Sequence, residues 1–155
     1  MRTLGNIIWF PFGLVLAIIH FLAGVVFLLP VVTAPIAFGL FQYAKFCFFP
    51  FTMAMVSKSD MGVKQNPIWR AYSAIFKVIY VVLFGIWGFV LGLAAIPFLC
   101  IWIVTIPHAI AYAKSLRTVL NPVGKICVSV ETRNELQRRK SIKEVNKLLD
   151  EDVQA

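Results

Sequence analysis

The sequence predicts an all-α integral membrane protein. We expect two tandem helical-hairpin repeats with about four membrane helices, then a short cytoplasmic strand and a C-terminal helix. The chain of 155 residues is 60% hydrophobic and only 14% charged, whereas soluble domains have about 25% charged residues. No charged residue occurs from Thr3 to Ala44 or from Val78 to Ala113. A membrane helix needs about 20 apolar residues, so each window, 42 and 36 residues long, has room for two crossings.

An internal repeat with an offset of 72 residues supports this class. Proline and glycine mark turns and the ends of helices, so their alignment is stronger evidence for a repeat than matches between apolar residues. The aligned residues are Phe12-Gly13 with Phe84-Gly85, Val32-Thr33 with Val104-Thr105, Pro35 with Pro107, Ala37 with Ala109, Pro50 with Pro122, and Val56-Ser57 with Val128-Ser129. We therefore predict a first membrane hairpin repeat (1–58), a cytoplasmic connector (59–77), a second membrane hairpin repeat (78–131), and a cytoplasmic amphipathic helix and tail (132–155).

The cations predict the orientation of the hairpins. They lie at the start, between the charge-free windows and after the second window, and none lies near Pro30 or Pro97. Lys and Arg mark the cytoplasmic side, so both termini should be cytoplasmic, with these prolines at the far turns. A single crossing per repeat would put one cationic cluster outside. Alternatively, the second arm of each hairpin is re-entrant or interfacial, because both arms carry polar residues.

The two ends of the chain carry further signals. The first apolar run continues past Leu29 without a small-residue cleavage site, so we expect a retained helix rather than a signal peptide. Pro107 should interrupt the descending helix of the second hairpin, and the turn signals in Leu120–Gly124 should end it. The alternation in KICVSVE then predicts a short strand. The TRNE stretch at Thr132–Glu135 is typical of a capping box that opens a helix.

Few residues are candidates for chemistry. Asp60 is the sole acid before Glu131, and the two histidines lie 88 positions apart, so we expect no enzyme, no metal site, no cofactor and no nucleic-acid binding. Polar residues inside a membrane usually face a bundle interior or a water path. The candidates for pore-lining or intramembrane polar residues are His20, Thr33, Gln42, Thr105 and His108. Two alternatives stay open: a neutral His20 bonded to a neighbouring helix, and threonines that only bond carbonyls freed by nearby prolines.

A set of cations is expected at the cytoplasmic interface, where long cationic side chains reach out of the membrane. They are Lys45, Lys114, Arg117 and Lys125. A positive face of this kind would attract anions or anionic headgroups. A role of these cations in fixing the orientation of the chain in the membrane explains them equally well.

The NPVGKICVSVE stretch resembles the YccF-like family of small bacterial inner-membrane proteins, which carry two copies of an inner membrane component domain. The second copy here is similar at Ile106-Pro107, Ile110-Ala111, Lys114, Pro122, Gly124 and Val128 through Glu131, and it departs at Ala109. The first copy is more divergent, since Pro35, Gly39, Lys45 and Pro50 remain but Thr52 stands where glycine is usual. The resemblance covers about residues 1–131. It implies an inner-membrane location and a duplicated hairpin, and it implies no activity.

Two functions of different classes remain. In the first, several copies assemble around a passage for ions or small solutes. In the second, the protein is a non-catalytic scaffold or adaptor that docks a partner through its C-terminal helix. Both predict a multi-pass protein of the bacterial inner membrane that contacts membrane lipid. The passage requires a homo-oligomer, and the adaptor has a membrane protein as its partner.

Overall fold

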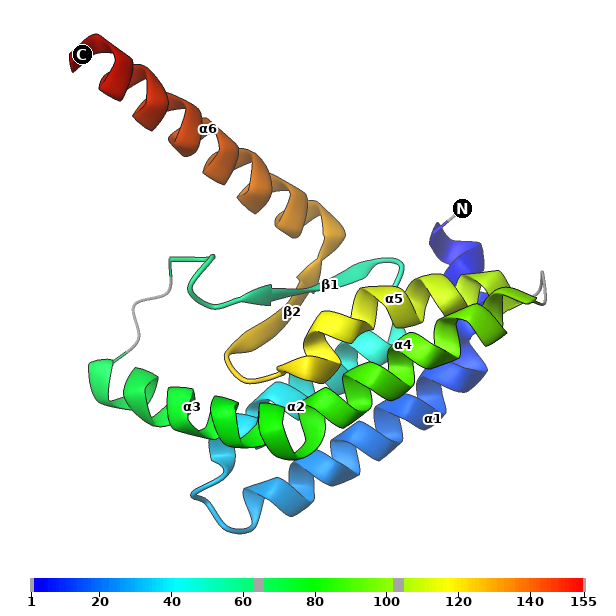
Figure 1. Cartoon of the computed structure of the whole chain (residues 1–155). Coiled ribbons are helices and arrows are strands. Elements are labelled where there is room, and N and C mark those ends of the chain that lie inside the picture. Colours follow the sequence, from blue (N-terminus) through cyan, green and yellow to red (C-terminus); the bar gives the residue numbers. More distant parts are fainter. Residues whose placement is uncertain (1, 63–65, 102–104, 155) are drawn as a thin grey trace.

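Two helical hairpins form the body of the molecule, in a computed structural model that describes residues 2–62, 66–101 and 105–154 (Figure 1). The first hairpin consists of α1 (Arg2–Leu28) and α2 (Ala34–Phe48), which pack closely along each other. The core lies around α2, which buries most of its side chains and rests on α1. α1 and α2 therefore form a helical hairpin, whose second arm has only 15 residues.

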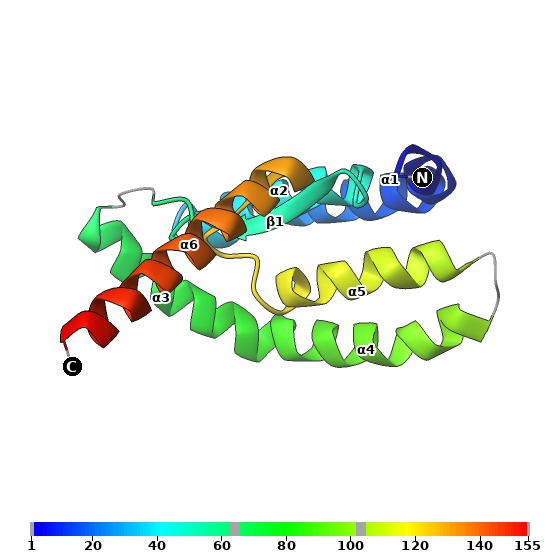
Figure 2. The same cartoon turned by 90° about the horizontal axis from the view of Figure 1, so that it is seen from above.

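The second hairpin begins with a long helical path. It runs from α3 (Pro67–Tyr80) through the π-helical turn η1 (Val81–Gly85) into α4 (Ile86–Ile101), and α5 (Ile106–Leu120) returns along it. Single π-helical turns are usually local insertions in an α-helix. Because α3 is continuous with α4, the last part of the predicted connector belongs to this hairpin. Seen from above, the two hairpins lie side by side (Figure 2).

Two prolines have other roles than predicted. Pro97 lies inside α4, which continues to Ile101, so Pro97 is not at the turn between the two arms. Pro107 lies in the first turn of α5, where a backbone N–H has no partner within the helix, so the N–H that proline lacks is not needed there. Pro107 therefore begins this helix and does not interrupt it. Pro30 does lie between α1 and α2, as expected.

A two-stranded antiparallel sheet covers one face of the hairpins (Figure 1). β2 (Lys125–Ser129) is the predicted strand, and it pairs with β1 (Met53–Ser57), which the sequence analysis did not predict. The register is centred on Met55 and Cys127, which are 72 residues apart. The same offset relates the bounds of α2 to those of α5, and the bounds of β1 to those of β2. Val104, one of the residues aligned above, lies outside the described residues.

Glycine allows the two arms of each hairpin to approach closely. A Cβ atom at Gly13 would collide with the carbonyl oxygen of Cys47, and one at Gly85 would collide with that of Leu120. These are the glycines of the two aligned Phe-Gly pairs. The sequence signal therefore marks the points where α1 meets α2 and where η1 meets α5.

The C-terminal helix α6 (Val130–Gln154) follows β2 directly and points away from the hairpins (Figure 1). Its capping residue is Ser129, whose Oγ accepts a hydrogen bond from the backbone N–H of Thr132 at 3.1 Å. The predicted cap at Thr132 is therefore wrong by three positions, because the helix begins as soon as the strand ends. The N–H of Val130 donates to the carbonyl of Thr52 at 2.9 Å and fastens the start of α6 to β1.

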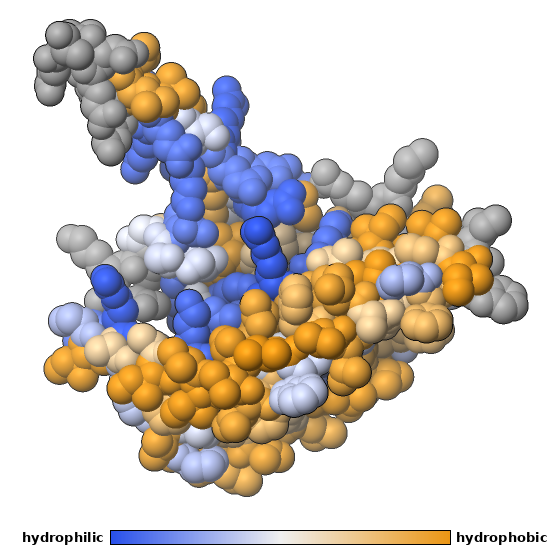
Figure 3. Space-filling model, in the orientation of Figure 1, coloured by the Kyte–Doolittle hydropathy of each residue, from blue (hydrophilic) through white to orange (hydrophobic). Residues whose placement is uncertain are grey.

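Two helical segments are long and apolar enough to cross a membrane: Thr3–Leu28 with 26 residues and Pro67–Ile101 with 35. Only 17% and 11% of their most apolar windows are buried, whereas the core helix of a soluble protein would be mostly buried. Apolar side chains cover the lower part of the visible face, and hydrophilic ones gather toward the sheet and α6 (Figure 3). Exposed apolar surface of this extent indicates a membrane protein.

Candidate functional site

His20 lies on α1 and is bonded within its own helix. Its Nδ1 lies 2.7 Å from the carbonyl oxygen of Leu16, so Nδ1 carries the proton and donates to that oxygen. The ring also meets Tyr43 of α2 edge-on, with centroids 4.6 Å apart. The histidine thus joins the two arms of the first hairpin.

The two threonines stabilise the turns of the hairpins. The Oγ1 of Thr33 donates to the carbonyl of Phe27, and the Oγ1 of Thr105 donates to the carbonyl of Leu99. Each acceptor lies six positions earlier, near the end of the preceding helix, where carbonyls lack helical partners. The acceptors are thus carbonyls at the ends of α1 and α4, not carbonyls freed by Pro35 and Pro107.

Gln42 and His108 also make structural contacts. The Oε1 of Gln42 accepts a hydrogen bond from the backbone N–H of Cys127 at 3.1 Å and so ties α2 to β2. His108 is 7% exposed, and its ring packs against Trp9 and Phe12 at centroid distances of 5.4 and 4.5 Å. Neither ring nitrogen of His108 has a hydrogen-bond partner among the described residues.

A cavity of about 250 Å³ lies between the two hairpins. His20 lines it together with three polar residues that the sequence analysis missed, Tyr43, Tyr112 and Ser115. The other four candidate polar residues are not among its described lining residues, so the structure does not bring the predicted set together. Several lining residues are 72 positions apart: Leu16 and Gly88, His20 and Gly92, Tyr43 and Ser115, and Cys47 and Val119. The repeat offset was therefore a usable signal for this cavity.

A larger groove of about 810 Å³ lies between α5, the sheet and the first half of α6. Three of the four predicted interface cations line it, Lys114, Arg117 and Lys125, whereas Lys45 does not. Two further cations that were not predicted, Arg133 and Lys140, reach the groove from α6. The RRK stretch at Arg138–Lys140 was a sign of contact with anionic lipid. No sequence signal placed Arg133 or Lys140 at this groove, because the start of α6 over the groove depends on the pairing of the two strands.

Lys125 is a partly buried cation of the groove. Its ammonium group donates to the carbonyl of Arg117. Burial, together with the smaller effect of the positive charges of Arg117 and Lys77, lowers its pKa from 10.5 to about 8. The neighbourhood of Lys125 is thus crowded with positive charge.

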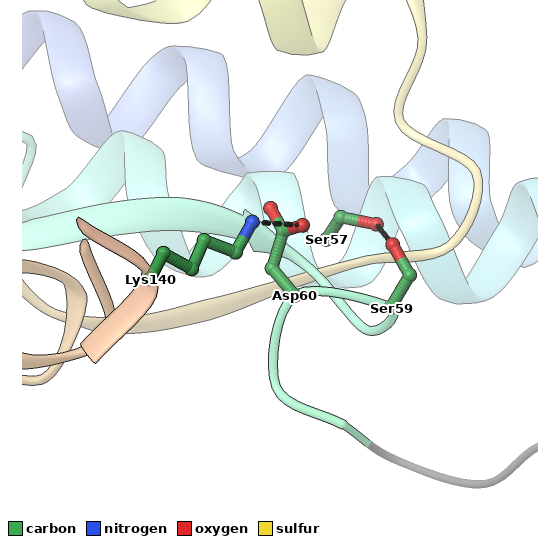
Figure 4. A network of polar contacts seen from close by, with 4 residues as sticks. All are labelled: Ser57, Ser59, Asp60 and Lys140. Atoms are coloured by element: carbon green, nitrogen blue, oxygen red, sulfur yellow. Dashed lines mark hydrogen bonds and ion pairs between the residues drawn. The ribbon is translucent and has the colours of Figure 1, made fainter. Parts of the chain in front are cut away.

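An ion pair holds α6 over the groove. The Nζ of Lys140 lies 2.5 Å from a carboxylate oxygen of Asp60, in the turn after β1, and the hydroxyls of Ser57 and Ser59 bond each other beside it at 2.8 Å (Figure 4). Asp60 is the one acid among the described lining residues of the groove. Its charge is therefore already matched by Lys140.

The long exposed apolar helices beneath a cationic, sheet-covered face define the chain as a membrane protein. Residues 4–52 match the family model of the inner membrane component domain, YccF, which confirms the resemblance to the YccF-like family over α1, α2 and the turn before β1. The match falls on the copy that the sequence analysis considered the more divergent one. No curated protein and no solved structure gives a match.

Proposed function

We propose that the protein is a non-catalytic scaffold of the bacterial inner membrane that docks a partner helix through α6. The observation that carries this proposal is an apolar stripe on one side of α6. The stripe consists of Ile142, Val145, Leu148 and Leu149, all of which are 50–61% exposed. It lies on the part of α6 that points away from the body of the molecule (Figure 1). Amphipathic helices typically bury such a stripe against another helix.

A second copy of the chain is the partner that suits α6 best. In the sequence, cations dominate the first half of α6, at Arg133, Arg138, Arg139 and Lys140, and three acids follow at Asp150–Asp152. Two copies in antiparallel alignment would bring the acidic end of one helix to the basic half of the other. Complementary charges of this kind set the orientation of helix pairs.

In this proposal both termini are cytoplasmic, and each hairpin enters and leaves the membrane on the same side. The 72-residue offset between α2 and α5 supports a duplicated hairpin. These second arms have 15 residues each, fewer than the roughly 20 of a full span, which supports the re-entrant alternative. The turn of the first hairpin also lies beside α3, since the hydroxyl of Tyr72 donates to the carbonyl of Val32.

Oligomeric mass tests the scaffold. The purified full chain in detergent is compared with the double variant Ile142→Asn and Leu149→Asn by light scattering. The matched control is Lys143→Asn, an exposed residue of the same helix that lies outside the stripe. We expect the wild type and the control to be dimers or larger, and the double variant to be a monomer. A monomeric wild type, or a double variant with unchanged mass, rejects α6 as the docking helix.

A passage for ions or small solutes is the second candidate, favoured by the cavity between the hairpins. Binding sites of duplicated transporters lie where the two halves meet, and His20, Tyr43 and Ser115 supply polar groups there. The test is ion flux into liposomes that contain the wild type or His20→Ala, at pH 5.5 and 7.5. Flux no greater than that of empty vesicles removes this candidate, and equal pH responses of the two proteins exclude His20 as a proton-sensitive group.

A further inference from the structure

The groove between α5, the sheet and α6 has both the charge and the shape of a binding site. Five cations line it, and the carboxylate of Asp60 is already paired with Lys140. Three of these cations are Arg117 of α5, Lys125 of β2 and Arg133 of α6. They come from three different elements, so their charges converge on the same space from three sides.

The crowding of these cations has a measurable consequence. Burial is the main cause of the lowered pKa of Lys125, and the nearby positive charges of Arg117 and Lys77 add to it. Like charges held together in a partly buried place repel each other. A bound anion would relieve this repulsion, and two arginine side chains with planar, forked donors suit the oxygens of a phosphate group.

The other half of the groove is apolar and belongs to the membrane-level helices. Its lining includes Phe89 of α4, Leu116 of α5 and Phe46 of α2, together with Phe51 near the sheet. A free inorganic anion would gain nothing from contact with these apolar side chains. An amphiphile with a phosphate at one end and an acyl chain at the other would use both halves of the groove.

The groove also lies at the height where lipid headgroups are expected. The sheet and α6 form its hydrophilic rim, and the apolar surface of the helices begins below them (Figure 3). Basic pockets on the cytoplasmic side of membrane helices bind anionic headgroups in this way.

We propose that this groove binds one anionic phospholipid, with its phosphate held by Arg117, Lys125 and Arg133 and an acyl chain lying over Phe89 and Leu116. The site is separate from the apolar stripe of α6 and does not require a second copy of the chain. Binding a lipid here would fix the angle between α6 and the membrane surface, because α5 and α6 supply opposite walls.

The test is calorimetric titration of the full chain in a non-ionic detergent with three probes: phosphatidylglycerol, phosphatidylcholine and inorganic phosphate. We expect saturable binding of phosphatidylglycerol, at least about tenfold tighter than binding of either other probe. The double variant Arg117→Gln and Lys125→Gln should lose about tenfold or more in affinity for phosphatidylglycerol. The conservative pair Arg117→Lys and Lys125→Arg should keep most of it, and far-UV circular dichroism should show that both double variants are folded.

The matched control removes the same charge from α6 outside the groove. Arg138→Gln with Lys143→Gln replaces two exposed cations that do not line the groove, and it should change the affinity less than about twofold. An equal loss in this control means that diffuse charge attracts the lipid, which overturns the site. Equal affinity for phosphatidylcholine overturns the role of the cations. Equal affinity for inorganic phosphate overturns the assignment to a lipid.

Discussion

The second arms of the two hairpins have the same length but very different surroundings. α2 buries ten of its 15 residues, because α1, α3 and β2 all lie against it. α5 buries six of 15, because one of its sides forms the wall of the groove. The residues that correspond across the 72-residue offset differ accordingly, since Lys114 corresponds to Gln42 and Lys125 to Met53. The first hairpin thus forms the structural centre of the molecule, and the second presents a charged surface to the groove.

The largest expected effect on stability comes from adding a side chain to α2 where a loop packs closely against it. A side chain at Gly39 would meet the carbonyl oxygen of Pro122, in the loop that leads from α5 to β2. Gly39→Leu should lower the free energy of unfolding by about 1–3 kcal/mol, because a backbone atom cannot move aside as a side chain can. Thermal denaturation in detergent measures the loss.

The matched control for this prediction is Phe38→Leu, one position earlier on α2 and 51% exposed, which should have little effect on stability. A Gly39→Leu variant as stable as this control would mean that the loop does not pack on α2. The corresponding position of the second hairpin already carries a side chain, the buried Ala111. The loop at Pro122 therefore approaches α2 more closely than a side chain at position 39 would allow.

A smaller loss is expected when the link between α2 and β2 is removed. In Gln42→Leu the backbone N–H of Cys127 loses its acceptor, and the loss of one partly buried hydrogen bond costs about 1 kcal/mol. Amide hydrogen exchange at Cys127 should become faster than exchange at Ile126, which serves as the internal reference. Unchanged exchange at Cys127 would show that water or another group replaces Gln42.

The sequence predicted the parts of this fold that depend on local signals. The charge-free windows located the long helices, Asn121-Pro122 marked the end of α5, and alternation found β2. It missed β1, because MAMVS has no comparable pattern and only the offset from β2 identifies it. The groove could not be foreseen, because Arg133 reaches it only through the register of two strands that are far apart in the chain.

The pH dependence of stability should reveal the difference between Lys125 and the corresponding residue of the first hairpin, Met53. The pKa of Lys125 is lowered to about 8 in the folded chain, against 10.5 ordinarily, so the unfolded chain binds more protons between these pH values. The free energy of unfolding should therefore rise with pH across this window. Melting temperatures in detergent from pH 7.5 to 10 should show a slope in the wild type that is weaker in Lys125→Met. Equal slopes in the wild type and in Lys125→Met would mean that a group other than Lys125 titrates in this pH range. The residue of the first hairpin that corresponds to Lys125, Met53, has no group that titrates.

The smallest effect is expected at the ion pair between Asp60 and Lys140. Both side chains are 42–49% exposed, and exposed pairs contribute about 0–1 kcal/mol. Asp60→Asn should thus lower the free energy of unfolding by less than about 1 kcal/mol, and added salt should erase the difference. Glu135→Gln, which breaks the local pair with Arg139 within α6, is the matched comparison and should cost a similar amount.

The two pairs differ in their position, because Arg139 and Glu135 point to solvent whereas Asp60 and Lys140 line the groove. When a lipid fills the groove, it excludes water from the second pair and strengthens the attraction. Repeating both measurements with phosphatidylglycerol should therefore increase the cost of Asp60→Asn and leave that of Glu135→Gln unchanged. Equal costs for both variants with and without lipid would indicate that the groove stays filled with water.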